Sequence, residues 1–512
     1  MALTMYDKSI VASGHQLVSD AAAEILNAGG NAFDAVVAAG FASSVVEPAL
    51  TSLGGGGLMV GHSQERGQDF FFDFFVDTPG RGSKVTQSEA DFFGVTVDFS
   101  GSSQDFNVGA GSVAVPGTLR GLVHSHRRLG RMPLAEVLVP ARSLALSHCL
   151  NDQQAHFLQL LHPIMTLTST GRALYQPEGN YLQPGDHLVN REMASFLDLL
   201  AQEGDHSFYH GEIAARIDRE MSECGGLLTA IDLASFEVKE RSPLKVPYRK
   251  GVLVTAPQPS MGGSLIGLSL SLLSGLEVDC FEWGSGEYLT QTVALMTEVE
   301  NLRQQGVTTP EALKKFITTG QECGQSMDRI RLFSRGTTHV SVADNKGNCA
   351  SMTCSNGEGS GYFAPGTGVM LNNMMGEDDL HPDGFHSSPP GERVFSMMSP
   401  SLLIEDDRVK LVIGSGGSKR IRTAVSQVLS QVVDFKRPLQ LAVDSPRLYL
   451  DEGLLQLEPG FDKDAVAALE KVVPVNTWEQ KDVYFGGVHA VIPGVEGAGD
   501  RRRGGSVVIV KH

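Results

Sequence analysis

The sequence has little cysteine, a deficit of positive charge and no long hydrophobic run. Its six cysteines are scattered over 512 residues without a C-x-x-C pair or a zinc-ligand spacing, so we expect reduced thiols. Lysine and arginine number 41 against 59 aspartate and glutamate residues, a formal net charge of −18. That charge argues against nucleic acid or an anionic membrane surface as a partner. The composition fits a soluble enzyme of small substrates.

Membrane and export signals are also missing. No uninterrupted apolar run reaches the length of a transmembrane helix. The first residues, Met1 to Lys8, lack a basic region followed by an apolar region. We therefore expect a cytoplasmic location and no membrane partner.

The most informative stretch runs from Gly336 to Val342 and reads GTTHVSV. Apolar residues alternate through it and again from Ala350, with polar turn residues between, which predicts a β-hairpin. Thr337 then opens a strand, and cleavage before it would make it an N-terminal nucleophile whose own α-amine is the general base. Gly336 suits the cut bond, because it has no side chain to hinder attack on its carbonyl.

The same run is also typical of an ordinary strand rich in β-branched residues, and further Thr-Thr pairs occur at 308–309 and 318–319. Motifs downstream decide between the two interpretations. The sequence MSP at 398–400 and the sequence GSGGS at 414–418 follow in order. With them, the stretch resembles the small subunit of the gamma-glutamyltranspeptidase family of N-terminal-nucleophile hydrolases.

Motifs upstream are similar to the large subunit of the same family: GGNAFDA at 29–35, VEP at 46–48 and GGGGL at 54–58. Residues 19–28 have an amphipathic helical pattern, Asn31 caps a second predicted helix, and residues 70–75 are typical of a buried strand. The resemblance implies an α+β fold, the four-layer αββα sandwich of N-terminal-nucleophile hydrolases. It also implies a large subunit, residues 1–336, and a small subunit, residues 337–512, interleaved in one domain.

The resemblance assigns the catalytic roles. It implies that Thr337 cleaves the bond after Gly336 and then serves as the nucleophile of the mature enzyme. Ser355 stands where the family has a threonine whose hydroxyl supports the nucleophile, and the exchange keeps the hydrogen-bonding group. Gly416 and Gly417 fall in the block that supplies the oxyanion-hole donors, although that block lacks one residue before the glycines and has one added after them.

The positions that would recognise glutamate depart from the family pattern. Phe75 stands where the family has an arginine for the α-carboxylate, and a phenyl ring cannot make that charge-assisted contact. Gly357 replaces an asparagine that contacts substrate, although the neighbouring Asn356 could reach the same space. Glu377 replaces the aspartate that binds the α-amine, so only the charge is kept.

Two further changes make the predicted acyl pocket more apolar. Met374 replaces a glutamine, and the pair Ser396-Met397 replaces two serines. A carboxylate buried there without a cation would be costly, so we expect an acyl group that is not an ordinary glutamyl unit. If the substrate does carry a carboxylate, Arg393 or Arg335 could supply a cation, although a solvated surface position fits each of them better.

The leading hypothesis is thus a self-cleaving N-terminal-threonine amidohydrolase or acyltransferase with a small amide as substrate and water or an amine as acceptor. Three alternatives stay open: a true gamma-glutamyltransferase or glutathione hydrolase, a small-acid amidase similar to oxamate amidohydrolases or cephalosporin acylases, and an uncleaved binding protein. We expect no cofactor and no metal, because His381 and His386 lie in a stretch with the composition of a loop.

Overall fold

A computed structural model describes residues 6–99, 102–319, 336–381 and 384–512 of the chain. Its first sheet has seven antiparallel strands. In spatial order these are β22 (Ser506–Lys511), β1 (Lys8–Ser13), β11 (Thr337–Ala343), β12 (Cys349–Ser355), β2 (Gly56–Ser63), β3 (Gln68–Phe74) and β8 (Lys239–Arg241). The predicted hairpin of residues 337–355 is confirmed as β11 and β12, and the predicted buried strand as β3.

The second sheet has six antiparallel strands. They are β21 (Glu496–Gly499), β20 (Gly487–Ile492), β16 (Arg408–Gly416), β15 (Ser401–Glu405), β10 (Gly251–Thr255) and β9 (Leu244–Tyr248). The two sheets meet face to face, and hydrogen bonds cross between them: Ser341 Oγ donates to the His489 carbonyl at 3.0 Å, and Ser351 Oγ to the Ile413 carbonyl at 3.0 Å.

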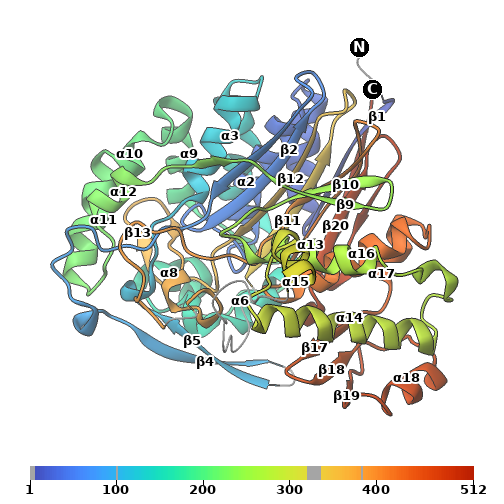
Figure 1. The fold of residues 1–512 in the computed structure, drawn as a ribbon. Helices are drawn as coiled ribbons and strands as arrows, with labels where there is room; N and C mark the ends of the chain where they lie inside the picture. Colours follow the sequence, from blue (N-terminus) through green and yellow to red (C-terminus); the bar gives the residue numbers. More distant parts are fainter. Residues whose placement is uncertain (1–5, 100–101, 320–335, 382–383) are drawn as a thin grey trace.

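Helices cover the outer face of each sheet, which completes four layers (Figure 1). The first sheet is covered by α1 (Gln16–Asn27), α2 (Ala32–Val46) and α3 (Thr118–Leu129), with α5 (Val139–Leu146) and α9 (Arg191–Glu203) packed outside these helices. The second is covered by α13 (Met261–Leu273), α16 (Arg420–Val433) and α17 (Leu439–Asp444), with α14 (Gly286–Gln304) packed against α13. The predicted α+β sandwich of αββα layers is confirmed.

Shorter elements pack around these layers. They are α4 (Leu134–Val137), α6 (Asp152–Leu160), α7 (His162–Met165), α8 (Ser169–Tyr175), α10 (His206–Tyr209), α11 (Glu212–Glu223), α12 (Ala230–Ser235), α15 (Pro310–Thr319), α18 (Lys463–Leu469), β4 (Phe93–Phe99), β5 (Ser102–Val108), β6 (His148–Cys149), β7 (His187–Leu188), β13 (Phe363–Ala364), β14 (Val369–Met370), β17 (Leu448–Asp451), β18 (Leu454–Leu457) and β19 (Val475–Thr477). Residues 320–335, directly before Gly336, lie outside the described part of the chain.

Helix α2 is the central support of the first sheet. Asn31 caps its N-terminus, as predicted: its side chain accepts hydrogen bonds from the backbone N–H groups of Phe33 and Asp34, and the Asp34 carboxylate accepts one from the Asn31 backbone N–H. Every residue of the helix is buried, as expected of a helix that is apolar on all sides. It ends directly before Glu47, so its C-terminus lies beside the start of β11.

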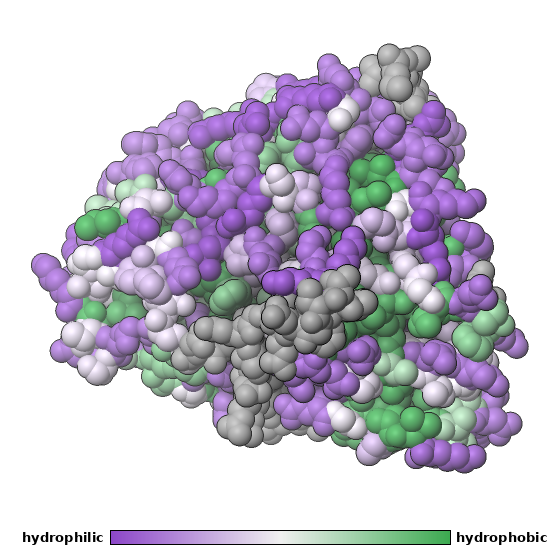
Figure 2. Space-filling view, viewed as in Figure 1, coloured by the Kyte–Doolittle hydropathy of each residue, from purple (hydrophilic) through white to green (hydrophobic). Residues whose placement is uncertain are grey.

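The surface is mainly hydrophilic on the face shown in Figure 2, with apolar side chains gathered where Figure 1 places α14 and β17–β19. The two described termini lie together, because β1 and β22 pair along their whole length. Among the described helices, none combines the length and the apolar character needed to span a bilayer.

Candidate active site

Thr337 is the first residue of β11, inside the first sheet. Its register partner on β12 is Ser355, and Ser355 in turn pairs with Gly56 on β2. Thr337 is only 3% exposed. Because side chains alternate along a strand, Thr337 and Thr338 point to opposite faces of the sheet.

The Ser355 hydroxyl bridges the two groups that a self-cleaving bond needs. Thr337 Oγ1 donates to Ser355 Oγ at 3.4 Å, and Ser355 Oγ donates to the Gly336 carbonyl oxygen at 2.5 Å. The Gly357 backbone N–H donates to the same hydroxyl at 3.1 Å and fixes its position. Ser355 therefore contacts both the hydroxyl of Thr337, the predicted nucleophile, and the Gly336 carbonyl that Thr337 would attack.

Gly336 is held at a very close approach to another backbone segment. A Cβ atom built on it would lie 1.7 Å from the Gly357 carbonyl oxygen, much closer than any real contact. No other residue fits there without moving the chain.

Gly416 ends β16 against the backbone of Thr337. A Cβ on Gly416 would lie 2.4 Å from the Thr337 carbonyl oxygen, so only glycine allows the two backbones to come this close. Gly417 has a φ of +119°, which also favours glycine. The structure thus brings Gly416 to the Thr337 backbone, whereas Gly417 lies against Gly486. The role of both glycines as oxyanion donors stays a prediction.

Two further residues that sequence reasoning missed also support the start of β11. Arg503 donates from Nη1 to the Thr337 carbonyl oxygen at 2.9 Å, and Glu47 accepts from Thr338 Oγ1 at 3.1 Å. Burial raises the pKa of Glu47 to about 7, although the Thr338 hydrogen bond and the nearby Arg503 charge oppose the shift. In the sequence, the VEP motif contains Glu47, and the run of three arginines at 501–503 contains Arg503; these were the only signals for the two residues.

His339 lies on the same face of β11 as Thr337, two residues further along. Its ring nitrogens bond Thr353 Oγ1 at 2.8 Å and Ser341 Oγ at 3.0 Å. Burial, with a smaller contribution from His489, lowers the pKa of His339 well below its ordinary value. A neutral ring held by two hydroxyls is a packed core group, so His339 is a poor candidate for the general base.

Two of the predicted substrate residues lie around Gly357. A Cβ on Gly357 would lie 2.2 Å from Glu377 Oε1, so the Glu377 side chain fills the space that a side chain at position 357 would need. Asn356 is 1% exposed, and neither atom of its amide has a hydrogen-bond partner among the described residues. Both side chains therefore belong to the neighbourhood of Ser355.

The predicted apolar acyl pocket is not one continuous surface. Phe75 and Met374, 3% and 1% exposed, are packed in the core between the sheets. Met397 instead packs with Leu265 and its neighbours beside α13 and α14. Ser396 Oγ accepts from the Met398 backbone N–H at 3.1 Å. The structure therefore separates Met397 from the other two.

The interpretation of Arg393 as a solvated surface charge is wrong. Its side chain is 7% exposed and is ion-paired with Asp73 at 3.0 Å and with Asp77 at 2.8 Å. It also donates to the Phe75 carbonyl oxygen at 2.5 Å. Arg393 is thus already neutralised by two carboxylates of the strand end and is not a free cation for substrate. Arg335 lies outside the described residues.

Comparison with known proteins identifies the family of this chain. The gamma-glutamyltranspeptidase family model matches residues 18–510. The chain belongs to this family. It is therefore an N-terminal-nucleophile hydrolase or acyltransferase, an enzyme of the class expected from its motifs.

Curated relatives of this gamma-glutamyltranspeptidase family member include an acylase proenzyme and a glutathione hydrolase proenzyme. "Acylase ACY 1 proenzyme" of Pseudomonas sp. (strain V22) is 32% identical over 498 residues, covering 90% of this chain and 86% of the relative. "Glutathione hydrolase proenzyme" of Escherichia coli (strain K12) is 30% identical over 507 residues, covering 90% and 85%. Among solved structures, cephalosporin acylase from Bacillus halodurans aligns with a TM-score of 0.80 and 22% identity, covering 99% of this chain and 97% of that one, which supports the fold.

Candidate metal ligands do not cluster in the described part of this family member. Within those ranges, no group of three or more histidine, cysteine, aspartate or glutamate side chains is placed to hold an ion. His381 is buried and its Nε2 bonds the Met374 carbonyl at 2.8 Å, and His386 Nε2 bonds the Gly111 carbonyl at 2.9 Å. These two histidines hold backbone segments together, and the absence of a cofactor stays a prediction.

Proposed function

We propose that this protein is a self-processing N-terminal-threonine amidohydrolase or acyltransferase whose substrate is a small amide with an acyl group other than an ordinary γ-glutamyl unit. The observation that carries the proposal is the position of the Ser355 hydroxyl. It bonds both Thr337 Oγ1, at 3.4 Å, and the carbonyl oxygen of Gly336, at 2.5 Å.

Processing begins when Thr337 Oγ1 attacks the Gly336 carbonyl carbon. The Gly336 C–N bond breaks, the nitrogen keeps its electron pair and takes up the hydroxyl proton, and an ester to Thr337 Oγ1 remains. Ser355 polarises the carbonyl by donating to its oxygen. Water then hydrolyses the ester, which leaves a carboxylate on Gly336 and a free α-amine on Thr337.

The mature enzyme uses the same hydroxyl on a substrate amide. The new α-amine accepts the proton of Thr337 Oγ1, an acyl-enzyme forms, and the amine portion of the substrate leaves. Water or a second amine then takes the acyl group. Gly416 and Arg503 hold the Thr337 backbone from one side, so the nucleophile stays in position through both steps.

The contacts of Arg393 support an acyl group other than glutamyl. The family arginine for the α-carboxylate is replaced by Phe75, and the cation that lies beside Phe75 is committed to Asp73 and Asp77. An α-carboxylate next to Phe75 would meet two carboxylates already paired with Arg393. Burying a third negative charge there without a new cation is unfavourable.

Processing is tested by denaturing electrophoresis and N-terminal sequencing of the purified protein. Two fragments are expected, and the smaller should begin at Thr337. The Thr337→Ala variant should stay as one full-length chain and have no amidase activity. A wild-type protein that remains a single band would favour the alternative of an uncleaved binding protein.

A true γ-glutamyl activity is the second candidate, because Glu377 reaches the space above Gly357 and can still meet an α-amine. One curated relative is also named a glutathione hydrolase. Matched 4-nitroanilides separate the two: the γ-glutamyl compound and a 4-aminobutanoyl compound, which lacks only the α-carboxylate. Faster turnover of the 4-aminobutanoyl compound supports our proposal, whereas robust turnover of the γ-glutamyl compound at low concentration would overturn it.

A further inference from the structure

Four residues from separate parts of the chain meet behind the start of β11. A Cβ atom built on Gly14 would lie 3.0 Å from Glu47 Oε1 and 3.3 Å from Thr338 Oγ1. It would also lie 3.4 Å from the Arg503 carbonyl oxygen. Glu47, Thr338 and Arg503 are all buried. A carboxylate and an arginine therefore meet at one buried point, next to the residue that follows Thr337.

Glu47 and Arg503 contact two successive residues of β11. The Glu47 carboxylate accepts from Thr338 Oγ1 at 3.1 Å. Arg503 Nη1 donates to the Thr337 carbonyl oxygen at 2.9 Å. The two side chains come from the C-terminal cap of α2 and from the turn between β21 and β22. The start of the strand is thus held from two directions, by an acidic group and a basic group.

A small cavity lies against the same two side chains. Its volume is about 20 Å³, which is room for about one water molecule, and its lining also includes His15 and Gln153. The titratable groups among its described lining residues are Glu47, His15 and Arg503. Burial lowers the pKa of His15 to about 4, so its ring is neutral near pH 7. The charge around this cavity is therefore set by Glu47 and Arg503.

Other titratable groups lie near Thr337 on neighbouring elements. Glu377 and Glu358 lie around the loop that follows Ser355. His339 is neutral, because burial lowers its pKa well below its ordinary value. A variant at position 47 or 503 leaves all three of these side chains in place. They therefore cancel from a comparison of such a variant with wild type.

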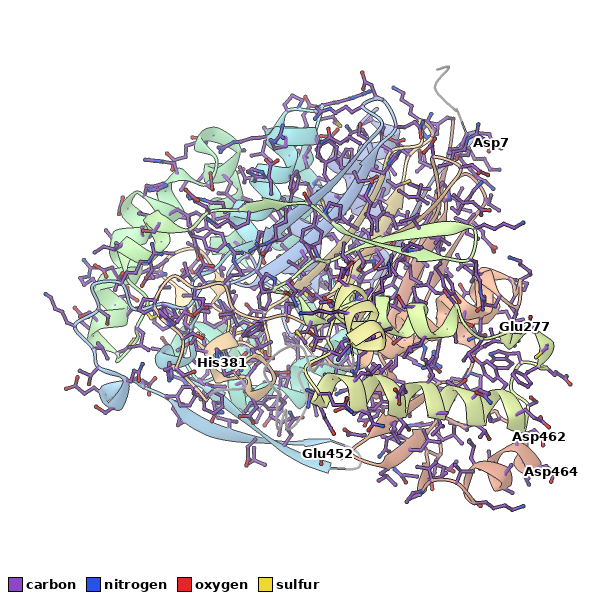
Figure 3. The ribbon with its side chains drawn as sticks, in the orientation of Figure 1. Asp7, Glu277, His381, Glu452, Asp462 and Asp464 are labelled. Carbon is purple, nitrogen blue, oxygen red and sulfur yellow. The ribbon has the colours of Figure 1, made fainter. Side chains whose placement is uncertain are left out.

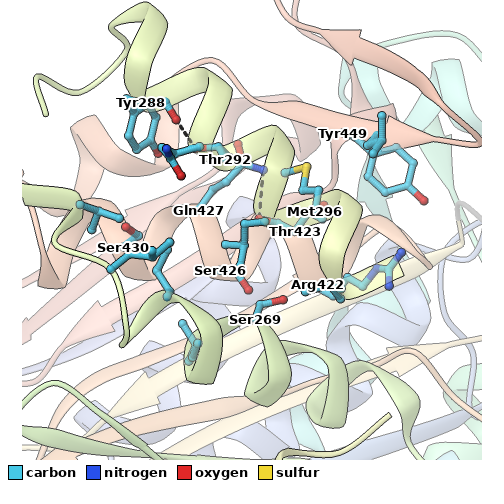
Figure 4. Close-up of a pocket in the computed structure, with 18 of the residues that line it drawn as sticks. Ser269, Tyr288, Thr292, Met296, Arg422, Thr423, Ser426, Gln427, Ser430 and Tyr449 are labelled. Carbon is cyan, nitrogen blue, oxygen red and sulfur yellow. Dashed lines mark hydrogen bonds between the residues drawn. The ribbon is translucent and has the colours of Figure 1, made fainter. Parts of the chain in front are cut away.

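Charged groups farther from β11 are exposed or separated from it. Figure 3 labels Glu277, Asp462 and Asp464 at the edge of the molecule, where all three are exposed. Water and salt screen such charges. The cavity in Figure 4, about 60 Å³ in volume, lies between α13, α14 and α16, and its described lining includes neither Glu47 nor any residue of β11. Glu47 and Arg503 differ from these groups because they are both buried and in contact with β11.

Processing adds a titratable group at this point, the α-amine of Thr337. The amine must be neutral to accept the Oγ1 proton. Thr337 is only 3% exposed. Neighbouring Cα atoms lie about 3.8 Å apart, so the new amine is close to the carboxylate that bonds Thr338. A nearby carboxylate favours the protonated amine, whereas a nearby guanidinium group favours the neutral one.

We propose that Glu47 and Arg503 are positioning residues, which hold the first two residues of β11 and, through their opposite charges, set the protonation of the Thr337 α-amine in the mature enzyme. This inference rests on the proposed function and names two residues that act on its general base. Burial raises the pKa of Glu47 to about 7, so its charge develops as the pH passes through neutrality. Above that pH, the carboxylate offsets the effect of Arg503 on the amine.

The test compares pH profiles of kcat/KM for variants that change one charge at a time, with the 4-nitroanilide that the wild type hydrolyses faster. The acidic limb of this profile reports the protonation of the base in the free enzyme. Glu47→Gln keeps an acceptor for Thr338 and should move the limb to lower pH by about one unit. Arg503→Gln should move it to higher pH by a similar amount. Arg503→Lys keeps the charge and Glu277→Gln removes an exposed one, so both should match wild type.

A second measurement follows the amine without turnover. The processed protein is labelled with a trace of acetic anhydride at a series of pH values, and mass spectrometry quantifies acetylation of the peptide that begins at Thr337. The pH midpoint of labelling should shift in the same two directions as the acidic limb. Loss of structural support alone would not shift the midpoint in opposite directions in Glu47→Gln and Arg503→Gln.

The outcomes separate this inference from the proposed function. A wild-type protein that remains one full-length band overturns both, because no α-amine forms on Thr337. If the wild type is processed, equal midpoints in wild type and Glu47→Gln overturn this inference alone, as do shifts in the same direction in Glu47→Gln and Arg503→Gln. If one of these two variants fails to fold or to process, the other decides: a shift in its expected direction supports the inference, and an unchanged midpoint overturns it.

Discussion

At the scale of single residues, Gly336 leaves the least room for a side chain among the described glycines. Its missing side chain lets its Cα lie against the Gly357 carbonyl while its own carbonyl, the one predicted to be cleaved, accepts from the Ser355 hydroxyl. We predict that Gly336→Ala blocks processing, because its Cβ would collide with the Gly357 carbonyl oxygen. Electrophoresis should show one full-length band. Gly94→Ala, where nothing lies within 4 Å of the new atom, should process like wild type.

Glu47 is a second single residue with a testable effect, because its ionisation makes the free energy of unfolding depend on pH. Its pKa is about 7 in the folded chain against 4.5 as the ordinary value, so its contribution to stability is fully present below pH 4.5 and is lost as the pH rises through 7. Glu47→Gln keeps an acceptor for Thr338 and cannot ionise. Relative to this variant, the wild type should lose on the order of 3 kcal/mol of unfolding free energy across that range.

Urea unfolding of both proteins at about pH 5 and about pH 8 measures this difference. The free energy of unfolding of the wild type, measured relative to that of Glu47→Gln, should fall as the pH rises. If the difference in unfolding free energy between the two proteins is the same at both pH values, Glu47 ionises as freely in the folded chain as in the unfolded one.

Sequence reasoning found the residues whose neighbours in the chain form a motif, and it missed those that act across the fold. Thr337 and Ser355 could be predicted because each lies in a recognisable run, and their contact follows from the register of one hairpin. The role of Arg503 could not be predicted from the sequence, because nothing distinguishes it there from Arg501 and Arg502. Only packing makes Arg501 85% exposed while Arg503 is buried and contacts Thr337.

At the scale of elements, the turn between β21 and β22 presents Arg503 to the Thr337 carbonyl, and a buried ionic network fixes that turn. Asp500 accepts from Arg447 Nη2 at 2.6 Å and from Arg502 Nη1 at 3.1 Å. Arg502 also pairs with Glu458. All four side chains are at most 2% exposed, so each charge depends on the others.

We predict that Asp500→Asn lowers the free energy of unfolding by about 3–5 kcal/mol, because it leaves buried arginine charge without its partner. Urea denaturation checks this. Arg501→Gln, which breaks an exposed pair with Asp444 at 3.8 Å, should cost less than about 1 kcal/mol and serves as the control. Similar losses in both variants would contradict a structural role for the network.

Several helices and strands could be predicted from local sequence patterns, but ion pairs between distant segments could not. The capped helix α2 and the hairpin of β11 and β12 follow from local patterns of capping and alternation. Arg393 was misjudged because its partners, Asp73 and Asp77, lie more than 300 residues away in sequence and meet it only through the path of a loop. Ion pairs between distant segments leave no local pattern to read.

At the scale of the whole molecule, the predicted cut after Gly336 divides both sheets. In the first sheet, β11 and β12 come from residues after the cut and lie between β1 and β2, which precede it. In the second sheet, β10 precedes the cut and pairs with β15, which follows it. Neither predicted subunit therefore holds a complete sheet.

This interleaving predicts that the two fragments stay together after processing. The processed protein should elute from a sizing column as one species and unfold in urea in a single transition followed equally by fluorescence and by circular dichroism, because each fragment needs the other to pair its strands. The unprocessed Thr337→Ala chain is the control for an uncut fold, and its midpoint should be higher, since a continuous chain retains less entropy when unfolded. Two separate transitions in the processed protein, or release of the smaller fragment before the larger unfolds, would contradict a shared core.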